Sequence, residues 1–211
     1  MKLVVFDCDS TLSAIEGIDE LARLRGPETF EKIEALTNAA MNGEVPIDQI
    51  FARRLSIIEP SEAACREVGE LYIKHIEPTA VATLKELRDS GWTPVIVSGG
   101  FTQVIEPLAE HLGIERVEAV PLRFDPDGHY AGYDTSAPPT RNGGKPEIIK
   151  ALKSEYQAER IVMIGDGISD LETKEEADLF IGFGRYCERE AVVAGATHFI
   201  KSLDALPGIL G

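Results

Sequence analysis

This chain has little cysteine, and what it has is scattered. Cys8, Cys65 and Cys187 are the only three, they lie far apart, and no Cys-x-x-Cys pair exists. The odd count and wide spacing exclude a disulfide framework and favour a reducing, cytoplasmic setting. No arginine stands six positions after any of them, so a phosphatase loop built on a cysteine nucleophile is excluded as well.

Positive charge and long hydrophobic runs are also scarce. The chain has 36 acidic residues against 21 Lys and Arg, a formal charge of −15. Such a surface repels nucleic-acid backbones and anionic lipid heads, so neither nucleic acid nor membrane is expected as a partner. A phosphorylated small molecule would need local cations to hold it. The first apolar run, residues 3–6, is far too short for a signal peptide or a membrane span.

Short apolar runs alternate with helical patterns along the 211 residues. The runs at 2–6, 93–100 and 159–167 are typical of buried strands, and 177–184 and 197–200 are weaker candidates. Amphipathic helices are expected over 79–91, 101–113 and 147–156. The pattern predicts an α/β fold with a doubly wound, mainly parallel sheet.

Two segments break this alternation. Residues 14–77 contain no convincing strand but four successive helical patterns, so we expect a helical cap inserted after the first strand. The core domain would then comprise residues 1–13 and 78–211, and the cap domain residues 14–77. The second segment, 117–133, carries Asp-Pro-Asp-Gly between apolar arms, which predicts a β-hairpin.

Polar and small residues gather where the predicted strands end. They follow the first strand (Asp7, Asp9), the second (Ser98, Gly99, Gly100) and a later one (Asp166, Gly167, Asp170), and Lys145 opens the helix before that last strand. In an open parallel sheet, ligands bind at the carboxyl ends of the strands. These side chains should therefore meet in one site.

Each of these features alone has a plainer interpretation. An Asp after a strand is often a helix cap or turn residue, Ser-Gly-Gly is often a turn, and a single lysine is usually solvated. The plainer readings weaken because all four features occur together and in this order at strand ends.

The chemistry that uses this set is phosphoryl transfer to a carboxylate. Asp7 can attack as nucleophile, and Asp9 can donate a proton to the leaving alkoxide and later take one from water. Several carboxylates beside a phosphate require a hard divalent cation, for which Mg²⁺ is suited. Lys145 can neutralise the phosphoryl oxygens, while a hydroxyl and backbone N–H groups hold the others.

The same motifs resemble those of the haloacid dehalogenase superfamily. Asp-Cys-Asp-Ser-Thr matches its first motif, Ser98 the second, Lys145 the third and the Gly-Asp-Gly-Ile-Ser-Asp segment the fourth. Further stretches, from residues 9–22 to 180–184, resemble the phosphoserine phosphatase family along nearly the whole chain. The resemblance implies a Mg²⁺-dependent hydrolase acting on phosphoserine through an aspartyl phosphate, in serine biosynthesis.

The resemblance also implies a role for each matching residue. The metal would be held by the Asp7 carboxylate, the Asp9 main-chain carbonyl and the Asp166 carboxylate, with Asp170 supporting from nearby. Phosphate would be held by Ser98, Gly99 and Lys145, with Gly100 beside them. From the cap, Glu16 would face the substrate ammonium, Arg54 its carboxylate and Met41 the pocket; Ser169 and Arg189 occupy family substrate positions.

Three places depart from the family's usual residues. Asn42 stands where glycine commonly follows the methionine, Val120–Pro121 replaces an Asn–Arg pair, and Ser169 replaces Thr or Asn. Other readings therefore stay open: a phosphatase or phosphotransferase for another small phosphomonoester such as homoserine phosphate, or a non-enzymatic receiver that stores an aspartyl phosphate. The sequence also leaves open whether the chain is a monomer or a homodimer.

Overall fold

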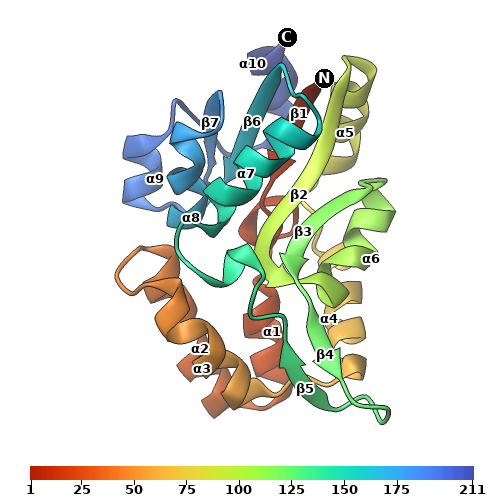
Figure 1. Ribbon diagram of the computed structural model, residues 1–211, viewed down its shortest axis with the longest axis vertical. Coiled ribbons are helices and arrows are strands. Elements are labelled where there is room, and N and C mark those ends of the chain that lie inside the picture. The colour runs from red at the N-terminus through yellow and green to blue at the C-terminus, as the bar shows by residue number, and fades with distance from the viewer.

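The computed structural model, which describes all of residues 1–211, is built around a six-stranded parallel sheet (Figure 1). The strand order is β3-β2-β1-β6-β7-β8. The strands are β1 (Lys2–Phe6), β2 (Trp92–Phe101), β3 (Arg116–Val120), β6 (Arg160–Gly165), β7 (Leu179–Phe183) and β8 (His198–Ile200). The predicted α/β class and parallel sheet are confirmed.

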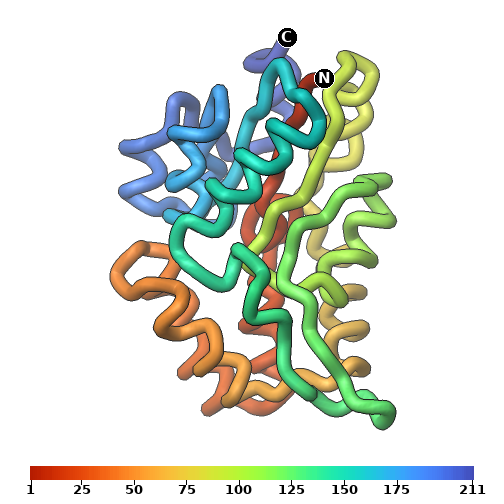
Figure 2. The backbone as a smooth tube through the Cα atoms, in the orientation of Figure 1, coloured from red at the N-terminus to blue at the C-terminus, as the bar shows by residue number.

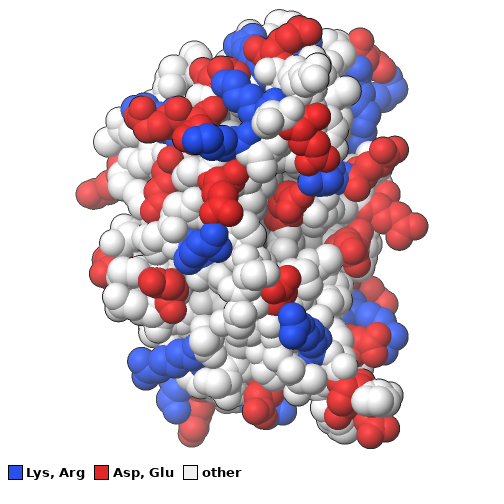
Figure 3. All heavy atoms as spheres, viewed as in Figure 1, with Lys and Arg blue, Asp and Glu red and all other residues white.

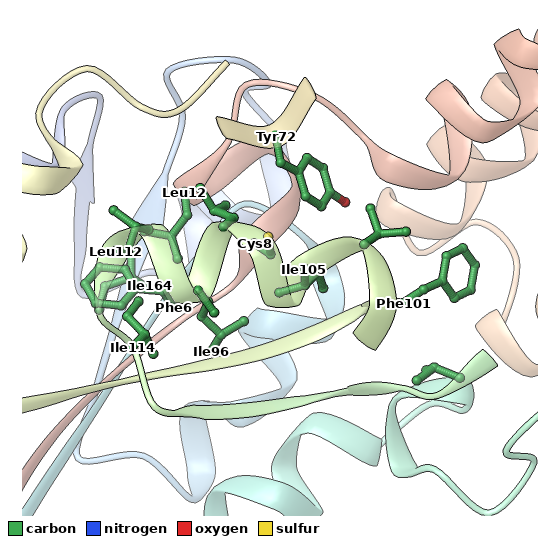
Figure 4. Close-up of a cluster of buried hydrophobic side chains, with 14 of the residues drawn as sticks. Phe6, Cys8, Leu12, Tyr72, Ile96, Phe101, Ile105, Leu112, Ile114 and Ile164 are labelled. Atoms are coloured by element: carbon green, nitrogen blue, oxygen red, sulfur yellow. The ribbon is translucent and has the colours of Figure 1, made fainter. Parts of the chain in front are cut away.

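The first strand lies at the centre because both of its faces are apolar. Val4 and Phe6 pack into the larger of two hydrophobic clusters, whereas Leu3 and Val5 pack into the smaller one. Alternating side chains of a strand point to opposite faces, so one five-residue run supplies both layers. Figure 4 shows part of the larger cluster, with Phe6, Cys8, Leu12 and Tyr72 among its labelled residues.

Helices cover both faces of the sheet. The helices that follow residue 77 are α5 (Ala80–Asp89), α6 (Thr102–Leu112), α7 (Gly144–Glu155), α8 (Ile168–Leu171), α9 (Glu190–Gly195) and α10 (Leu206–Leu210). Helix α7 packs on the smaller cluster, and α5, α6 and α10 pack on the larger one. The helices expected over 79–91, 101–113 and 147–156 are all present.

Residues 14–77 form the four expected helices, α1 (Gly17–Leu24), α2 (Pro27–Met41), α3 (Ile47–Ile58) and α4 (Glu62–Lys74). The two ends of this insert lie side by side, because Ser13 forms a bridge with Ile76 and Glu77 N–H donates to the Leu12 carbonyl at 2.8 Å (Figure 2). Helix α4 packs against α6, where Gly69 lets the two helices approach closely.

The prediction of a single hairpin over 117–133 was wrong for its first arm. Residues 116–120 form β3, which pairs in parallel with β2 at the edge of the main sheet. The antiparallel hairpin is shorter, β4 (Leu122–Phe124) with β5 (Tyr130–Tyr133). Pro121 lies between β3 and β4. Because proline has no backbone N–H to donate to a neighbouring strand, it ends the pairing of β3.

The surface carries charges of both signs. On the face in Figure 3, acidic and basic side chains are interspersed rather than gathered into large patches. None of the helices combines the length and apolar character needed to cross a bilayer.

Candidate active site

The site is built at the carboxyl end of β1. The Asp7 N–H donates to the Ile164 carbonyl at 2.9 Å, which extends the β1–β6 ladder by one residue and fixes the Asp7 backbone. Its Oδ1 accepts the Cys8 N–H at 2.7 Å, and its Oδ2 lies 2.9 Å from Lys145 Nζ. The carboxylate of Asp7 is thereby held in one orientation at the floor of a pocket.

Lys145 is a buried cation shared by two carboxylates. Its Nζ lies 2.5 Å from Asp170 Oδ1 as well as near Asp7. Burial alone would lower the pKa of Lys145, but the charges of Asp170 and Asp7 outweigh it and raise that pKa above its usual value. Gly144 is required just before it, because a Cβ there would collide with the Pro138 carbonyl.

Asp7, Asp166 and Asp170 form a buried acidic cluster, with one carboxylate oxygen of each within 4.8 Å of the others. Burial, and then the charge of Asp7, raise the pKa of Asp166 to about 7. The same two causes raise the pKa of Asp170 well above its usual value. Hard oxygen donors in this arrangement are the ligands that a divalent cation such as Mg²⁺ prefers, so the residues fit such an ion.

Two further side chains touch the Asp166 carboxylate. The Thr11 hydroxyl lies 3.4 Å from its Oδ1, and Arg189 Nε lies 3.4 Å from its Oδ2. Arg189 is itself buried. These contacts orient the carboxylate, and the arginine offsets part of the negative charge.

The two oxygens of Asp9 face different surroundings. Oδ1 accepts the Gly17 N–H at 2.5 Å and the Tyr72 hydroxyl, whereas Oδ2 lies 3.4 Å from the Ser98 hydroxyl. Burial and the charge of Asp7 raise the pKa of Asp9 to about 6, against the opposing hydrogen bonds from Tyr72 and Gly17. A carboxyl with such a pKa can both give and take a proton near neutral pH.

The Ser98–Gly100 segment forms one wall of the pocket. The structure includes these residues in β2, which ends at Phe101, rather than after the strand. The pairing of β2 with β3 shifts register between Val97 and Phe101, so the segment is irregular. A Cβ on Gly100 would lie 2.8 Å from Asp9 Oδ2, so only glycine leaves that oxygen room.

The helical insert supplies the opposite wall. The Glu16 Oε1 accepts the Ser10 hydroxyl at 2.6 Å, and burial followed by the charge of Asp9 raises the pKa of Glu16 well above its usual value. Arg54 comes from α3, is buried, and donates from Nη1 to the Thr37 hydroxyl at 3.2 Å. Its Nε has no hydrogen-bond partner.

Most of the predicted site residues line this one pocket. Those that do are Asp7, Asp9, Glu16, Met41, Arg54, Ser98, Gly99, Gly100, Lys145, Asp166 and Ser169. Asp170 and Arg189 are not among its lining residues. They lie behind the pocket, where Asp170 contacts Lys145 and Arg189 contacts Asp166.

Other lining residues were missed from the sequence, namely Ile18, Ile47, Phe51, Pro139 and Arg141. Ile18, Ile47 and Phe51 lie on helix faces that look like ordinary core, and Pro139 lies in a short 3₁₀ turn. Arg141 could have been noticed, because it is a cation four positions before Lys145. Tyr72 carried no signal at all, since a tyrosine on an amphipathic helix normally indicates packing.

The chain is similar in sequence to known proteins over nearly its whole length. Residues 4–174 match the model of the haloacid dehalogenase-like hydrolases. The chain is 36% identical to the phosphoserine phosphatase of Homo sapiens over 209 residues, which cover 98% of this chain and 92% of that protein.

Solved structures agree in fold over the whole chain. A phospho-aspartyl intermediate analogue of phosphoserine phosphatase superposes with a TM-score of 0.86 at 28% identity, covering 100% of this chain and 99% of that one. A substrate-bound phosphoserine phosphatase complex gives a TM-score of 0.86 at 26% identity, covering 100% and 98%.

Proposed function

This chain belongs to the haloacid dehalogenase-like hydrolases and, among them, to the phosphoserine phosphatases, and from that membership we propose that it hydrolyses O-phospho-L-serine to serine and phosphate. The proposal rests mainly on the pocket's lining, in which phosphate-binding groups from the core face charged groups from the helical insert. Asp7 and Lys145 stand at the phosphate end of the pocket, and Glu16 and Arg54 face it from the helical insert.

In the first step, an Asp7 oxygen forms a bond to phosphorus while the bond from phosphorus to the serine oxygen breaks. Asp9 gives its proton to that departing oxygen, so serine leaves as a neutral alcohol. Lys145, held against Asp7, offsets the negative charge that gathers on the phosphoryl oxygens. Ser98 and the backbone of Gly99 and Gly100 complete the phosphate cradle.

In the second step, water attacks the phosphorus of the aspartyl phosphate. Asp9, now ionised, takes a proton from that water, and the bond between phosphorus and the Asp7 oxygen breaks. Phosphate is released, Asp7 is restored as a carboxylate, and Asp9 is again protonated. One carboxyl thus serves both steps, which is consistent with its pKa of about 6.

The proposed cofactor is Mg²⁺, held by the carboxylates of Asp7 and Asp166 and the main-chain carbonyl of Asp9, with Asp170 alongside. When bound, it supplies positive charge that lets the phosphate approach the acidic cluster. The support is the buried carboxylate cluster and the raised pKa of Asp166.

The cap residues would read the amino-acid part of the substrate. Glu16 suits the ammonium, and the fork of Arg54 suits the carboxylate. The buried Nε of Arg54 has no hydrogen-bond partner within the chain. Met41 lines the pocket between them, while Ser169 and Arg189 lie on the metal side. We assign residues 1–13 and 78–211 to a core domain and residues 14–77 to a cap domain. When closed over the core, the cap would shield the site from water.

The test measures phosphate release from L-phosphoserine with Mg²⁺, beside homoserine phosphate and p-nitrophenyl phosphate. We expect a strong preference for phosphoserine that is lost on adding EDTA and in Asp7→Asn. The Arg54→Ala variant should lose phosphoserine hydrolysis far more than p-nitrophenyl phosphate hydrolysis. Release from homoserine phosphate at an equal or higher rate would instead favour another phosphomonoester as the substrate.

A further inference from the structure

Tyr72 reaches the catalytic centre from a helix that no part of the mechanism above uses. It lies on α4, and its side chain is fully buried in the larger hydrophobic cluster. Figure 4 shows its ring above Cys8 and Leu12, with the oxygen at the free end of the ring. That hydroxyl donates to Asp9 Oδ1, the oxygen that also accepts the Gly17 N–H.

Gly17 and Tyr72 fit each other. A Cβ on residue 17 would overlap the Tyr72 hydroxyl and approach Asp9 Oδ1, so only glycine allows all three groups to meet. Gly17 is the first residue of α1 and its backbone conformation is open to any residue, so space and not backbone freedom requires glycine here. A glycine and a buried tyrosine are thus both required for the contacts to one oxygen of Asp9.

Two donors on one oxygen decide where a proton can sit on the carboxyl. A proton on Oδ1 would compete with the Gly17 N–H for that oxygen and would force the Tyr72 hydroxyl to accept instead of donate. A proton on Oδ2 keeps both hydrogen bonds and competes only with the longer, 3.4 Å contact from the Ser98 hydroxyl. Oδ2 also lies beside Gly100, and both Ser98 and Gly100 line the substrate pocket. The hydrogen bonds from Tyr72 and Gly17 to Oδ1 therefore orient the Asp9 carboxyl so that Oδ2 faces the pocket.

We propose that Tyr72 is a positioning residue that, together with the Gly17 N–H, fixes the orientation of the Asp9 carboxyl so that Oδ2 faces the oxygen of the leaving group. The inference rests on the proposed role of Asp9 as the proton donor. Tyr72 does not line the pocket, and its hydroxyl donates to Asp9 alone, so it would act through Asp9. Its removal leaves the Gly17 N–H as the one remaining donor on Oδ1, so the orientation of the carboxyl is less firmly held.

The effect depends on how much the leaving group needs a proton. Nitrophenolate is a stable anion and departs with little help, whereas phenolate and especially a serine alkoxide leave poorly without protonation. General acid catalysis contributes about 10²–10⁴-fold, and a misdirected acid forfeits part of that factor. A tyrosine that only supported the fold would slow every substrate alike.

The experiment compares Tyr72→Phe with the wild-type enzyme on p-nitrophenyl phosphate, phenyl phosphate and L-phosphoserine, measured as kcat/KM, which reports the step in which the leaving group departs. Phenylalanine keeps the ring and removes only the donor. We expect kcat/KM to fall about tenfold more for phenyl phosphate and phosphoserine than for p-nitrophenyl phosphate. Tyr156→Phe, on the other face of the sheet, is the matched control and should leave all three rates unchanged.

Equal losses on all three phosphates, or no loss on any, would overturn the proposal. Asp9→Asn separates it from the proposed function. If that variant is selective for the better leaving group and Tyr72→Phe is not, Asp9 is the acid and Tyr72 does not aim it. If neither is selective, Asp9 is not the acid and both ideas fail together. Thermal unfolding of Tyr72→Phe shows whether the fold is intact, and Gly17→Ala, which displaces the hydroxyl sterically, should reproduce the same selectivity.

Discussion

Asn42 Oδ1 accepts a hydrogen bond from Arg189 Nη1 at 2.8 Å, and this bond joins the helical insert to the catalytic core. Asn42 caps the C-terminus of α2, and Arg189 precedes α9 and also contacts Asp166. The bond therefore connects the insert to a proposed metal ligand through one arginine. A glycine at position 42 would have no side chain to make this bond.

Asn42→Ala should weaken substrate binding by removing this connection. A hydrogen bond to a charged group contributes about 1.5–3 kcal/mol in a buried setting and less at an exposed residue such as Asn42, so we expect KM for phosphoserine to rise about fivefold with kcat little changed. Steady-state kinetics measure this. Asn38→Ala, one turn earlier on the exposed face of α2, is the control, and an equal effect there would contradict the assignment.

Thr37 connects Arg54, the residue proposed to bind the substrate carboxylate, to a buried acid. Its hydroxyl donates to Asp19 Oδ1 at 2.8 Å and accepts from Arg54 Nη1 at 3.2 Å, so one side chain joins α1, α2 and α3. Thr37→Val keeps the shape of the side chain but removes the hydroxyl, so Asp19 and Arg54 both lose a hydrogen-bond partner. We expect KM for phosphoserine to rise about tenfold and the free energy of unfolding to fall by about 1–3 kcal/mol.

For Thr37→Val, the measurements are KM for phosphoserine and for p-nitrophenyl phosphate, together with a thermal unfolding curve. The KM for p-nitrophenyl phosphate should change little, because that substrate has no carboxylate for Arg54 to bind. Thr29→Val on the same helix serves as control. A matched rise in KM for both substrates would mean that Thr37 supports the whole insert rather than the orientation of Arg54.

Asp19 makes stability depend on pH in a defined direction. Burial raises its pKa from 3.8 to about 6, against the opposing Thr37 hydrogen bond and Arg54 charge. The folded state therefore binds the proton more tightly than the unfolded state, and this contribution is present below about pH 4 and lost as pH rises through 6. A pKa difference of about two units between the folded and unfolded states corresponds to about 3 kcal/mol in the free energy of unfolding.

Asp19→Asn cannot ionise, so the difference between variant and wild type isolates this group. The stability of Asp19→Asn relative to wild type should increase as pH rises from 4 to 6 and then stay constant. Chemical denaturation at several pH values measures it. A difference that stays flat over that interval would show that Asp19 titrates normally.

Mg²⁺ should stabilise the protein through the buried cluster, and more weakly in acid. The pKa of Asp166 is about 7, so protons compete with the metal below that pH, and the apparent Kd should rise about tenfold for each unit. Thermal unfolding with and without Mg²⁺ at pH 6 and 8 tests this. Asp166→Asn should abolish the shift.

A second acidic group provides the control for that measurement. Asp125, Asp127 and His129 in the β4–β5 hairpin are exposed and also lie close enough together to attract a cation. Asp125→Asn should leave the Mg²⁺ shift intact. If it removes the shift and Asp166→Asn does not, the stabilising ion binds at the hairpin.

Much of the site was predictable because its residues follow strands. Asp7, Ser98 and Asp166 lie at or near the ends of parallel strands, and such ends share one edge of a sheet by geometry alone. Lys145 follows no strand, but it opens the helix that leads into β6, and that end of the helix lies at the same edge of the sheet as Asp7. The strand at 116–120 was misplaced because its residues also suit a hairpin arm, and only the shape of β2 decides which neighbour they pair with.

The sequence alone determined the alternation of strands and helices, the helical insert and the order of the acidic motifs, since these depend on local spacing. Only the tertiary structure decided which side chains from the insert reach those acids. Tyr72 meets Asp9 across 63 positions and Asn42 meets Arg189 across 147. Such contacts depend on how α4 and α2 dock on the core, and helix packing is set by whole faces rather than by any single residue.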